Sequence, residues 1–221
     1  MKFLLCFLLV IIMPVPGFSK IENWDKFNSS LLIEVTKDNA VFTCTGVAIS
    51  DHIIVTAAHC LVGEIQKVRI FVGDTYDPKK PSLEMASFRV HPDYNPMKSN
   101  YQNDIAKITM KEKIPSYINL CPIHQGPTVV GQIYRFGFGA RDKKNVRTVI
   151  TPTFRQINTL TGVVELNDTY SQSGDSGGPI FVDSGKGISV LAIHSTLSSG
   201  PEGRFSFNPL LSHYLSWIYQ N

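Results

Sequence analysis

The chain contains 221 residues, of which 43% are apolar and 18% are charged, with a formal net charge of +3 at pH 7. This length suffices for one large domain or two small ones with buried cores. Lys2 and Lys20 account for two of the 21 basic residues, so the rest of the chain has 19 basic and 18 acidic side chains. That balance does not favour binding to nucleic acid or to a membrane surface.

The first nineteen residues have the organisation of a secretory signal peptide. Met1-Lys2 precedes an apolar run over residues 3–13, and prolines and small residues follow up to Ser19. The run is short for a membrane span. We therefore expect residues 1–19 to be removed and the protein to be secreted, into the extracellular space or a periplasm. A retained membrane anchor is the alternative.

Short runs rich in Val, Ile, Phe and Thr follow, and they predict two successive groups of β-strands. The first group comprises residues 31–36, 41–50, 53–56, 68–72, 85–90 and 105–109, and the second comprises 132–138, 162–166, 179–182, 187–194 and 204–207. The intervening residues 114–129 are rich in proline and glycine, which favours a crossing between two units. Only residues 209–220 have apolar side chains at helical spacing.

The segment Thr56-Ala57-Ala58-His59-Cys60 ends a predicted strand in the first group. Histidine is the side chain best suited to accept a proton from a serine near neutral pH. Asp104 stands at the head of a later strand and provides an acid. Each residue also has a structural interpretation: His59 as a core histidine and Asp104 as a turn cap.

Residues 173–179 read Ser-Gly-Asp-Ser-Gly-Gly-Pro, and three glycines in so short a segment favour a sharp turn. Ser176 would then be exposed at the bend, and its N–H could point the same way as that of Gly174. A hydroxyl beside paired N–H donors is what acyl transfer requires. The alternative is a plain glycine- and serine-rich loop between two strands.

These segments together resemble the signature segments of the chymotrypsin/trypsin family of serine peptidases. The resemblance rests on Ala57-Ala58-His59-Cys60, on Asp104-Ile105-Ala106 and on Gly174-Asp175-Ser176-Gly177-Gly178-Pro179, in this order. It extends to Cys44-Thr45-Gly46, to Gly137-Phe138-Gly139 and to the tryptophan segment near the end of the chain.

The resemblance implies an all-β fold of two antiparallel six-stranded β-barrels with a C-terminal α-helix. We expect the first barrel at about residues 31–113, the second at about 128–208 and the helix at about 209–220. The family's mechanism would make Ser176 the nucleophile, His59 the proton carrier and Asp104 the acid that orients it. The N–H groups of Gly174 and Ser176 would form the oxyanion hole.

The same resemblance predicts how the cysteines pair and where the mature chain begins. Cys44 and Cys60 match a family disulfide, which leaves Cys121 as a buried free thiol or as the site of an intermolecular disulfide. Lys20 would be a one-residue propeptide, and a cut before Ile21 would release an amine that pairs with Asp175. Ile21 is not followed by the family's usual continuation, so Lys20-Ile21 could instead simply begin the mature chain.

Seven residues are expected to line the pocket that selects the residue before the scissile bond. They are Tyr170, Ser171, Ser173, His194, Ser195, Leu197 and Gly203. Asp168 is displaced from the place where trypsin relatives carry an aspartate, which disfavours trypsin-like selectivity. The sequence Ile193-His194-Ser195 is similar to that of glutamyl endopeptidases, and imidazole with hydroxyl groups can bind a carboxylate. His194 could equally be a structural histidine beneath the pocket.

The sequence therefore predicts a secreted serine endopeptidase, with an acidic residue as one candidate for the preferred position before the cut. We expect polypeptide substrates, an inhibitor or activating protease as further partners, a monomer, no cofactor and no metal site. Two other interpretations stay open. One is a binding protein that has lost catalysis, and the other is a toxin or processing protease of narrow selectivity.

Overall fold

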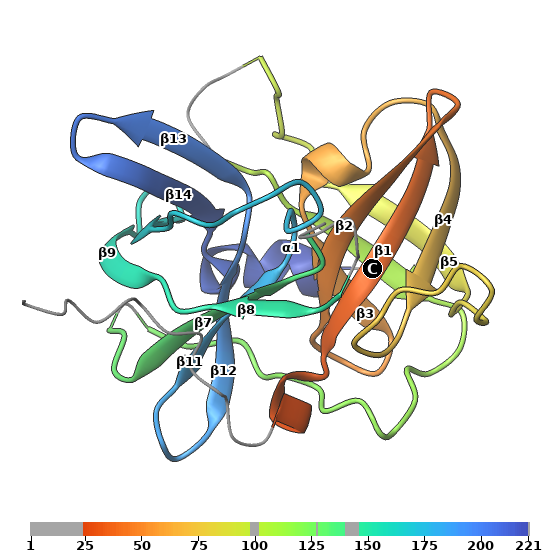
Figure 1. Ribbon diagram of the computed structural model, residues 1–221, viewed down its shortest axis with the longest axis horizontal. Coiled ribbons are helices and arrows are strands. Elements are labelled where there is room, and N and C mark those ends of the chain that lie inside the picture. The colour runs from red at the N-terminus through yellow and green to blue at the C-terminus, as the bar shows by residue number, and fades with distance from the viewer. Residues whose placement is uncertain (1–23, 98–101, 127, 140–145, 221) are drawn as a thin grey trace, which may run out of the picture.

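The computed structural model describes residues 24–97, 102–126, 128–139 and 146–220, and Figure 1 shows their arrangement. The expected signal peptide, Lys20 and Ile21 lie outside the described residues. The predicted all-β fold of two antiparallel β-barrels with a C-terminal helix is confirmed, except that the second unit has eight strands where six are predicted. None of the helices among the described residues is long and apolar enough to cross a membrane.

The first unit is one antiparallel sheet of six strands. These are β1 (Ser30–Lys37), β2 (Ala40–Ala48), β3 (Ile53–Thr56), β4 (Ile65–Phe71), β5 (Met85–Val90) and β6 (Ala106–Met110), in the spatial order β4-β1-β2-β3-β6-β5. A bridge between Ile70 and Leu83 brings the chain from β4 back toward β5, so the sheet nearly closes on itself. Its interior holds aliphatic side chains such as Leu31, Ile33 and Ile54, all without exposed surface.

The second unit has eight strands in two four-stranded sheets. These are β7 (Gln132–Gly137), β8 (Thr148–Ile150), β9 (Thr153–Asn158), β10 (Val163–Asn167), β11 (Pro179–Asp183), β12 (Ile188–Ile193), β13 (Thr196–Gly200) and β14 (Gly203–Pro209). One sheet has the order β13-β14-β10-β9 and the other the order β12-β11-β7-β8. Strands β8, β9 and β13 were absent from the prediction. All three are edge strands, so their sequences are short or polar and lack the apolar pattern of strands with two neighbours.

A shared apolar cluster joins the two units. Val47 and Val55 of the first sheet pack in the same cluster as Phe136 and Phe181 of the second unit. Phe27, in the short 3₁₀ helix η1 (Trp24–Phe27), stacks on Phe136 with ring centroids 4.6 Å apart. Because the core is continuous across the boundary, the residues that meet there are held in one rigid arrangement.

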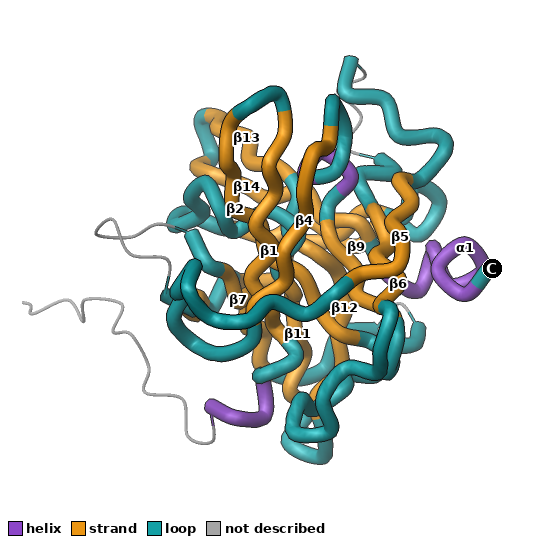
Figure 2. The backbone as a smooth tube through the Cα atoms, turned by 90° about the vertical axis from the view of Figure 1, so that its right-hand side faces the viewer, coloured by secondary structure: helices purple, strands orange, loops and turns teal. Residues whose placement is uncertain are grey.

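The C-terminal segment is a 3₁₀ turn η3 (Leu211–Tyr214) followed by the helix α1 (Leu215–Tyr219). It is shorter than the predicted 209–220, because Pro209 is taken into β14, where it pairs with Val163. Figure 2 shows α1 beside β5 and β6. Lys107 of β6 donates from Nζ to the carbonyl oxygens of Trp217 and Ile218 at 3.4 and 3.0 Å, which satisfies the C-terminal end of the helix.

Candidate active site

His59 lies in the 3₁₀ turn η2 (Ala58–Cys60) directly after β3. A disulfide between Cys44 and Cys60 ties this turn to β2. Lys37 of β1 donates from Nζ to the carbonyl oxygen of His59 at 3.0 Å. The backbone of His59 is thus held by neighbours on both sides, while a third of its side chain remains exposed.

Asp104 accepts three hydrogen bonds although only 3% of the residue is exposed. The N–H and Nδ1 of His59 lie 2.8 and 2.7 Å from its two carboxylate oxygens, and the hydroxyl of Ser195 donates at 2.5 Å. Burial alone would raise the pKa of Asp104, but the bonds from His59 and Ser195 lower it below the ordinary value. The carboxylate is therefore ionised at neutral pH.

The preceding residue, Asn103, aims Asp104 at the histidine. Asn103 has a φ of +60°, in the left-handed region that asparagine tolerates better than most residues. The hydroxyl of Tyr214 accepts a hydrogen bond from the Asn103 N–H at 3.0 Å and lies 3.2 Å from its side-chain oxygen. The C-terminal segment thus supports the turn from which Asp104 projects.

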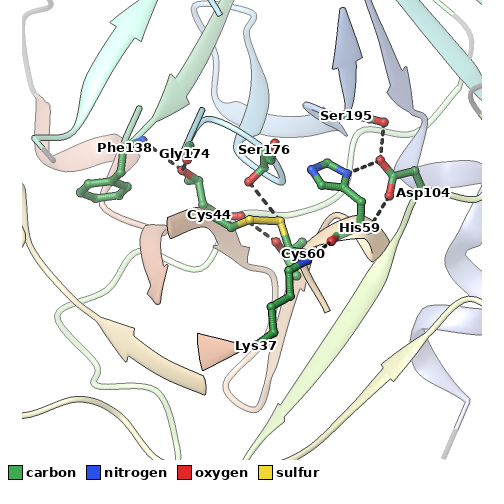
Figure 3. The surroundings of a disulfide bond; sticks show 11 residues. Lys37, Cys44, His59, Cys60, Asp104, Phe138, Gly174, Ser176 and Ser195 are labelled. Carbon is green, nitrogen blue, oxygen red and sulfur yellow. Dashed lines mark hydrogen bonds and ion pairs between the residues drawn. A yellow bond between two sulfur atoms is a disulfide. The ribbon is translucent and has the colours of Figure 1, made fainter. Parts of the chain in front are cut away.

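The pairing with Asp104 determines the tautomer of His59. An ionised carboxylate only accepts hydrogen bonds, so the neutral imidazole carries its proton on Nδ1 and leaves Nε2 as an acceptor. Figure 3 shows the ring between Asp104 on one side and Ser176 on the other. The unprotonated nitrogen thus faces the serine, which is the geometry for accepting its proton.

Ser176 lies in a turn whose shape depends on glycine. Gly174 and Gly177 have φ angles of +102° and +78°. A Cβ atom on Gly177 would lie 2.1 Å from the hydroxyl oxygen of Thr56, so only glycine allows this approach to the first unit. The N–H groups of Gly174 and Ser176 donate to no acceptor within the described part of the chain. Two donors are therefore free to bind an oxyanion beside Ser176.

Asp175 is fully buried and its carboxylate is surrounded by donors. The N–H groups of Gly139 and Gln172 donate to it at 2.8 and 3.0 Å, and Nη1 of Arg135 lies 3.1 Å away. Its expected partner, the amine of Ile21, lies outside the described residues. Among the described residues, Arg135 is a charged partner of Asp175 that was not expected from the sequence.

His194 is buried, and each of its ring nitrogens has a polar neighbour. Nε2 lies 2.5 Å from the hydroxyl of Ser171, and Nδ1 lies 3.2 Å from Oδ1 of Asn208. Asn208 uses its amide N–H groups on the carbonyl oxygen of Val164 and the hydroxyl of Ser206, so its oxygen must face the histidine. Nδ1 of His194 therefore carries the proton, and Nε2 accepts from Ser171.

Burial and, after it, the nearby guanidinium of Arg135 lower the pKa of His194 to about 4, although Asp168 and Asp175 partly oppose them. The imidazole is therefore neutral at neutral pH. Asp168 does not provide a free acid in this region. It is 1% exposed and accepts from Nε and Nη2 of Arg135 at 2.7 and 3.1 Å.

The other expected pocket residues lie in different environments. Tyr170, Ser173 and Gly203 are exposed, and Leu197 is half-buried. Gly203 begins β14 with a φ of +118°, at the turn from β13. Ser195 directs its hydroxyl to Asp104, the carboxylate that binds His59, so the contact of its side chain is with this carboxylate and not with the pocket.

Three residues with clear structural roles were not singled out from the sequence. Thr45 contacts the turn that carries Ser176, Arg135 pairs two buried aspartates, and Asn208 orients His194. For Arg135 a signal did exist, because it is a single charge between apolar residues in a predicted strand. The described residues contain no group of three or more His, Cys, Asp or Glu side chains placed to hold a metal ion.

The chain is similar to known proteins of one family. Residues 25–218 match the family model described as Trypsin. The chain is 27% identical over 237 aligned positions to "Phenoloxidase-activating factor 3" of Holotrichia diomphalia, covering 86% of this chain and 67% of that protein. It is 31% identical over 107 positions to "CLIP domain-containing serine protease B4" of Anopheles gambiae, covering 41% of this chain and 30% of that protein.

Proposed function

Because the chain belongs to the trypsin family of serine endopeptidases, we propose that it hydrolyses peptide bonds through an acyl-enzyme intermediate formed on Ser176. One observation carries the proposal: the imidazole of His59 is hydrogen-bonded to the buried Asp104 on one side and faces Ser176 on the other. Two unpaired N–H groups beside Ser176 complete the set of groups that acyl transfer needs.

In the proposed reaction, the hydroxyl oxygen of Ser176 attacks the scissile carbonyl carbon while Nε2 of His59 takes the proton. The carbonyl oxygen becomes negative and is bound by the N–H groups of Gly174 and Ser176. The ionised Asp104 stabilises the imidazolium. Nε2 then returns the proton to the departing amine nitrogen as the C–N bond breaks. A water molecule, activated in the same way, hydrolyses the ester and restores Ser176.

The test is labelling by a fluorophosphonate together with hydrolysis of a protein substrate by the secreted chain. Labelling should locate to Ser176 by mass spectrometry and should vanish in Ser176→Ala. Ser199→Ala, which removes an exposed serine, is the matched control and should label like the wild type. A folded wild-type protein that reacts with no fluorophosphonate would show that the proposed function is wrong.

We also propose that the protein is secreted after removal of residues 1–19 and matures by a cut before Ile21. The composition of the first twenty residues supports secretion, and the basic Lys20 suits a trypsin-like activating enzyme. N-terminal sequencing of the protein from culture medium tests both steps. A mature chain that begins at a residue other than Ile21 would contradict the maturation cut.

For specificity, we propose that the pocket beside Ser171 and His194 accepts an acidic side chain. Neutral His194 has no proton on Nε2 to donate, so it must gain one when a substrate carboxylate binds. A buried negative charge raises the pKa of a neighbouring histidine, which makes this uptake favourable. The preference for glutamate over the isosteric glutamine should therefore increase as the pH falls from 8 to 6.

Paired peptides that differ only in Glu or Gln before the scissile bond provide the measurement. The ratio of their kcat/KM values should rise toward low pH in the wild type and become independent of pH in His194→Gln. If the enzyme cleaves after Lys or Phe but not after Glu, the acidic preference is wrong and the serine peptidase mechanism is unaffected.

A second candidate is a processing protease that cuts very few proteins. It is favoured by the similarity to a protein named as an activating factor, since activation by limited proteolysis requires narrow selectivity. Such an enzyme would label with fluorophosphonate at Ser176 yet leave casein intact. Rapid digestion of casein would exclude this candidate.

A further inference from the structure

A buried three-residue ion cluster lies beneath the turn that carries Ser176. Arg135, Asp168 and Asp175 have side chains that are at most 1% exposed. Arg135 binds Asp168 through Nε and Nη2, and its third nitrogen, Nη1, lies 3.1 Å from Asp175. One guanidinium therefore contacts two carboxylates, and each carboxylate belongs to a segment next to the candidate active site.

Strand β7 and the residues just after it form the site for Asp175. Arg135 and Gly137 lie two residues apart in β7 and project to the same face of the strand, and Gly139 follows two residues later. A Cβ atom on Gly137 or Gly139 would lie 2.2 or 2.6 Å from Oδ1 of Asp175. These two glycines leave room for the carboxylate, and Arg135 supplies a positive charge beside it.

Asp168 binds the same guanidinium at the start of the segment that runs from residue 168 to residue 175. It follows β10 and accepts from the N–H of Tyr170 at 3.3 Å, two residues along the chain. Residues 168 and 175 bracket the stretch that contains Ser171 and Gly174. With both ends bound to Arg135, this stretch has little freedom to change its conformation.

We propose that Arg135 is a positioning residue that holds Asp175, and with it the N–H groups of Gly174 and Ser176, in the geometry for catalysis without needing a free amine at Ile21. A carboxylate this deeply buried requires a partner charge, and the guanidinium is covalently part of the folded chain. The maturation cut, if it occurs, is then not the event that forms the oxyanion hole. The inference rests on the proposed function for the catalytic role of this turn.

The guanidinium of Arg135 and an α-amine at Ile21 can be distinguished experimentally because their pKa values differ. An α-amine has an ordinary pKa of about 8, which pairing with Asp175 would raise, and it loses its charge in alkali, whereas a guanidinium stays charged. Burial lowers the pKa of Arg135, but the two aspartates outweigh it and raise the value above the ordinary one. A turn held by Arg135 keeps its structure at alkaline pH, and one held by an amine does not.

The experiment compares a chain that begins at Ile21 with the same chain carrying a short Gly-Ser extension before Ile21. Hydrogen exchange of residues 172–178 is measured in the Ser176→Ala background, where no activity is needed, and kcat/KM is measured from pH 7 to pH 10 in chains that keep Ser176. We expect equal protection in both chains and kcat/KM values within about twofold of each other. Between pH 7 and pH 10, neither chain should show the loss of activity that deprotonation of an α-amine would cause.

Arg135→Gln should accelerate exchange across residues 172–178 and lower kcat by about 10²–10³, the usual cost of losing an oxyanion donor. KM should change little, and Arg135→Lys should recover part of kcat. Arg155→Gln removes an exposed arginine that pairs with Glu202, and it should match the wild type. If Arg135→Gln does not fold, the comparison between the chain that begins at Ile21 and the extended chain tests the proposal by itself.

The outcomes distinguish the two proposals. Protection of residues 172–178 only in the chain that begins at Ile21 would overturn the role of Arg135, even if that chain is an active peptidase. Equal protection in both chains with no hydrolysis by either would refute the proposed function and leave Arg135 as the residue that holds the turn.

Discussion

The hydroxyl of Thr45 donates a hydrogen bond of 2.7 Å to the carbonyl oxygen of Gly174, which links a strand of the first unit to the Ser176 turn of the second. The same hydroxyl accepts from the N–H of Phe138 at 3.0 Å, and the N–H of Thr45 donates to the carbonyl oxygen of Ser176 at 2.7 Å. Thr45 therefore sets the position of Ser176 relative to His59, which is attached to the same first unit.

Replacing Thr45 by valine should destabilise the protein and slow catalysis. Valine has nearly the same shape but leaves the buried N–H of Phe138 and the carbonyl of Gly174 without this partner, which costs about 1–3 kcal/mol. Urea denaturation measures the loss, and kcat should fall because the Ser176 turn shifts. Thr151→Val, at an exposed threonine, is the control. Wild-type stability in Thr45→Val would contradict this role.

The sequence was sufficient to locate the strands that pair with a neighbour on both sides. It was also sufficient to single out His59, Asp104 and Ser176 as candidate catalytic residues. The apolar runs of β1, β3 and β6 report burial directly, and the glycines around Ser176 report a turn that other residues cannot adopt. Local pattern could not reveal β9 or β13, because β9 is largely exposed, β13 is only partly buried, and the strand form of both depends on pairing with β10 and β14.

The partners of the site residues lay beyond the reach of local sequence for a different reason. Ser195 and Asp104 are 91 residues apart, and Arg135 and Asp168 are 33 apart. The first pair depends on how the two units pack, and the second on how the two sheets of the second unit face each other. No spacing rule encodes either arrangement. The catalytic roles of His59, Asp104 and Ser176 stay predictions until labelling is done, whereas the geometry now explains why these positions lie together.

Ser195→Ala should weaken both the stability and the catalytic rate. Without this donor the pKa of Asp104 rises toward its ordinary value, so the carboxylate stabilises the His59 imidazolium less. A hydrogen bond to a charged group contributes about 1.5–3 kcal/mol, which is the expected loss in unfolding free energy at pH 7. Ser199→Ala is the control.

The pH dependence of that loss has a definite sign. The pKa of Asp104 is lower in the folded than in the unfolded state, so its contribution to stability is present above about pH 4 and disappears as the pH falls through the folded pKa. Wild type and Ser195→Ala should therefore converge in acid. A difference in unfolding free energy that stays constant over the whole acid range in which the wild type loses stability would show that the hydroxyl does not act through the charge of Asp104.

Removing the Cys44–Cys60 disulfide should destabilise the protein by about 3 kcal/mol, the value expected for a loop of this length. The two cysteines are 16 residues apart, and the loop includes His59. Urea denaturation of the double variant Cys44→Ala, Cys60→Ala measures the change. A reducing agent should bring the wild type close to the variant and leave the variant unchanged. If the reduced wild type kept its full stability, the bond would not constrain the unfolded chain.

His194 should make the protein less stable as the pH falls from 6.5 to 4. Its pKa is about 4 in the folded state and about 6.5 in the unfolded state, so over this range the unfolded chain binds a proton that the folded chain does not. The corresponding loss is about 3 kcal/mol, following from 1.36 kcal/mol per pH unit of pKa difference. This loss of stability is absent above the unfolded-state pKa of His194 and complete below its folded-state pKa.

Unfolding free energies in urea between pH 7.5 and pH 4 provide the measurement. His194→Gln should be less stable than the wild type at pH 7.5, because the contacts to Ser171 and Asn208 are lost, and the difference should shrink as the pH falls. His213→Gln, at an exposed histidine, reports the effect of a surface substitution. Parallel curves for the wild type and His194→Gln would mean that His194 takes up its proton equally in both states, and the neutral buried imidazole on which the proposed acidic preference depends would be refuted.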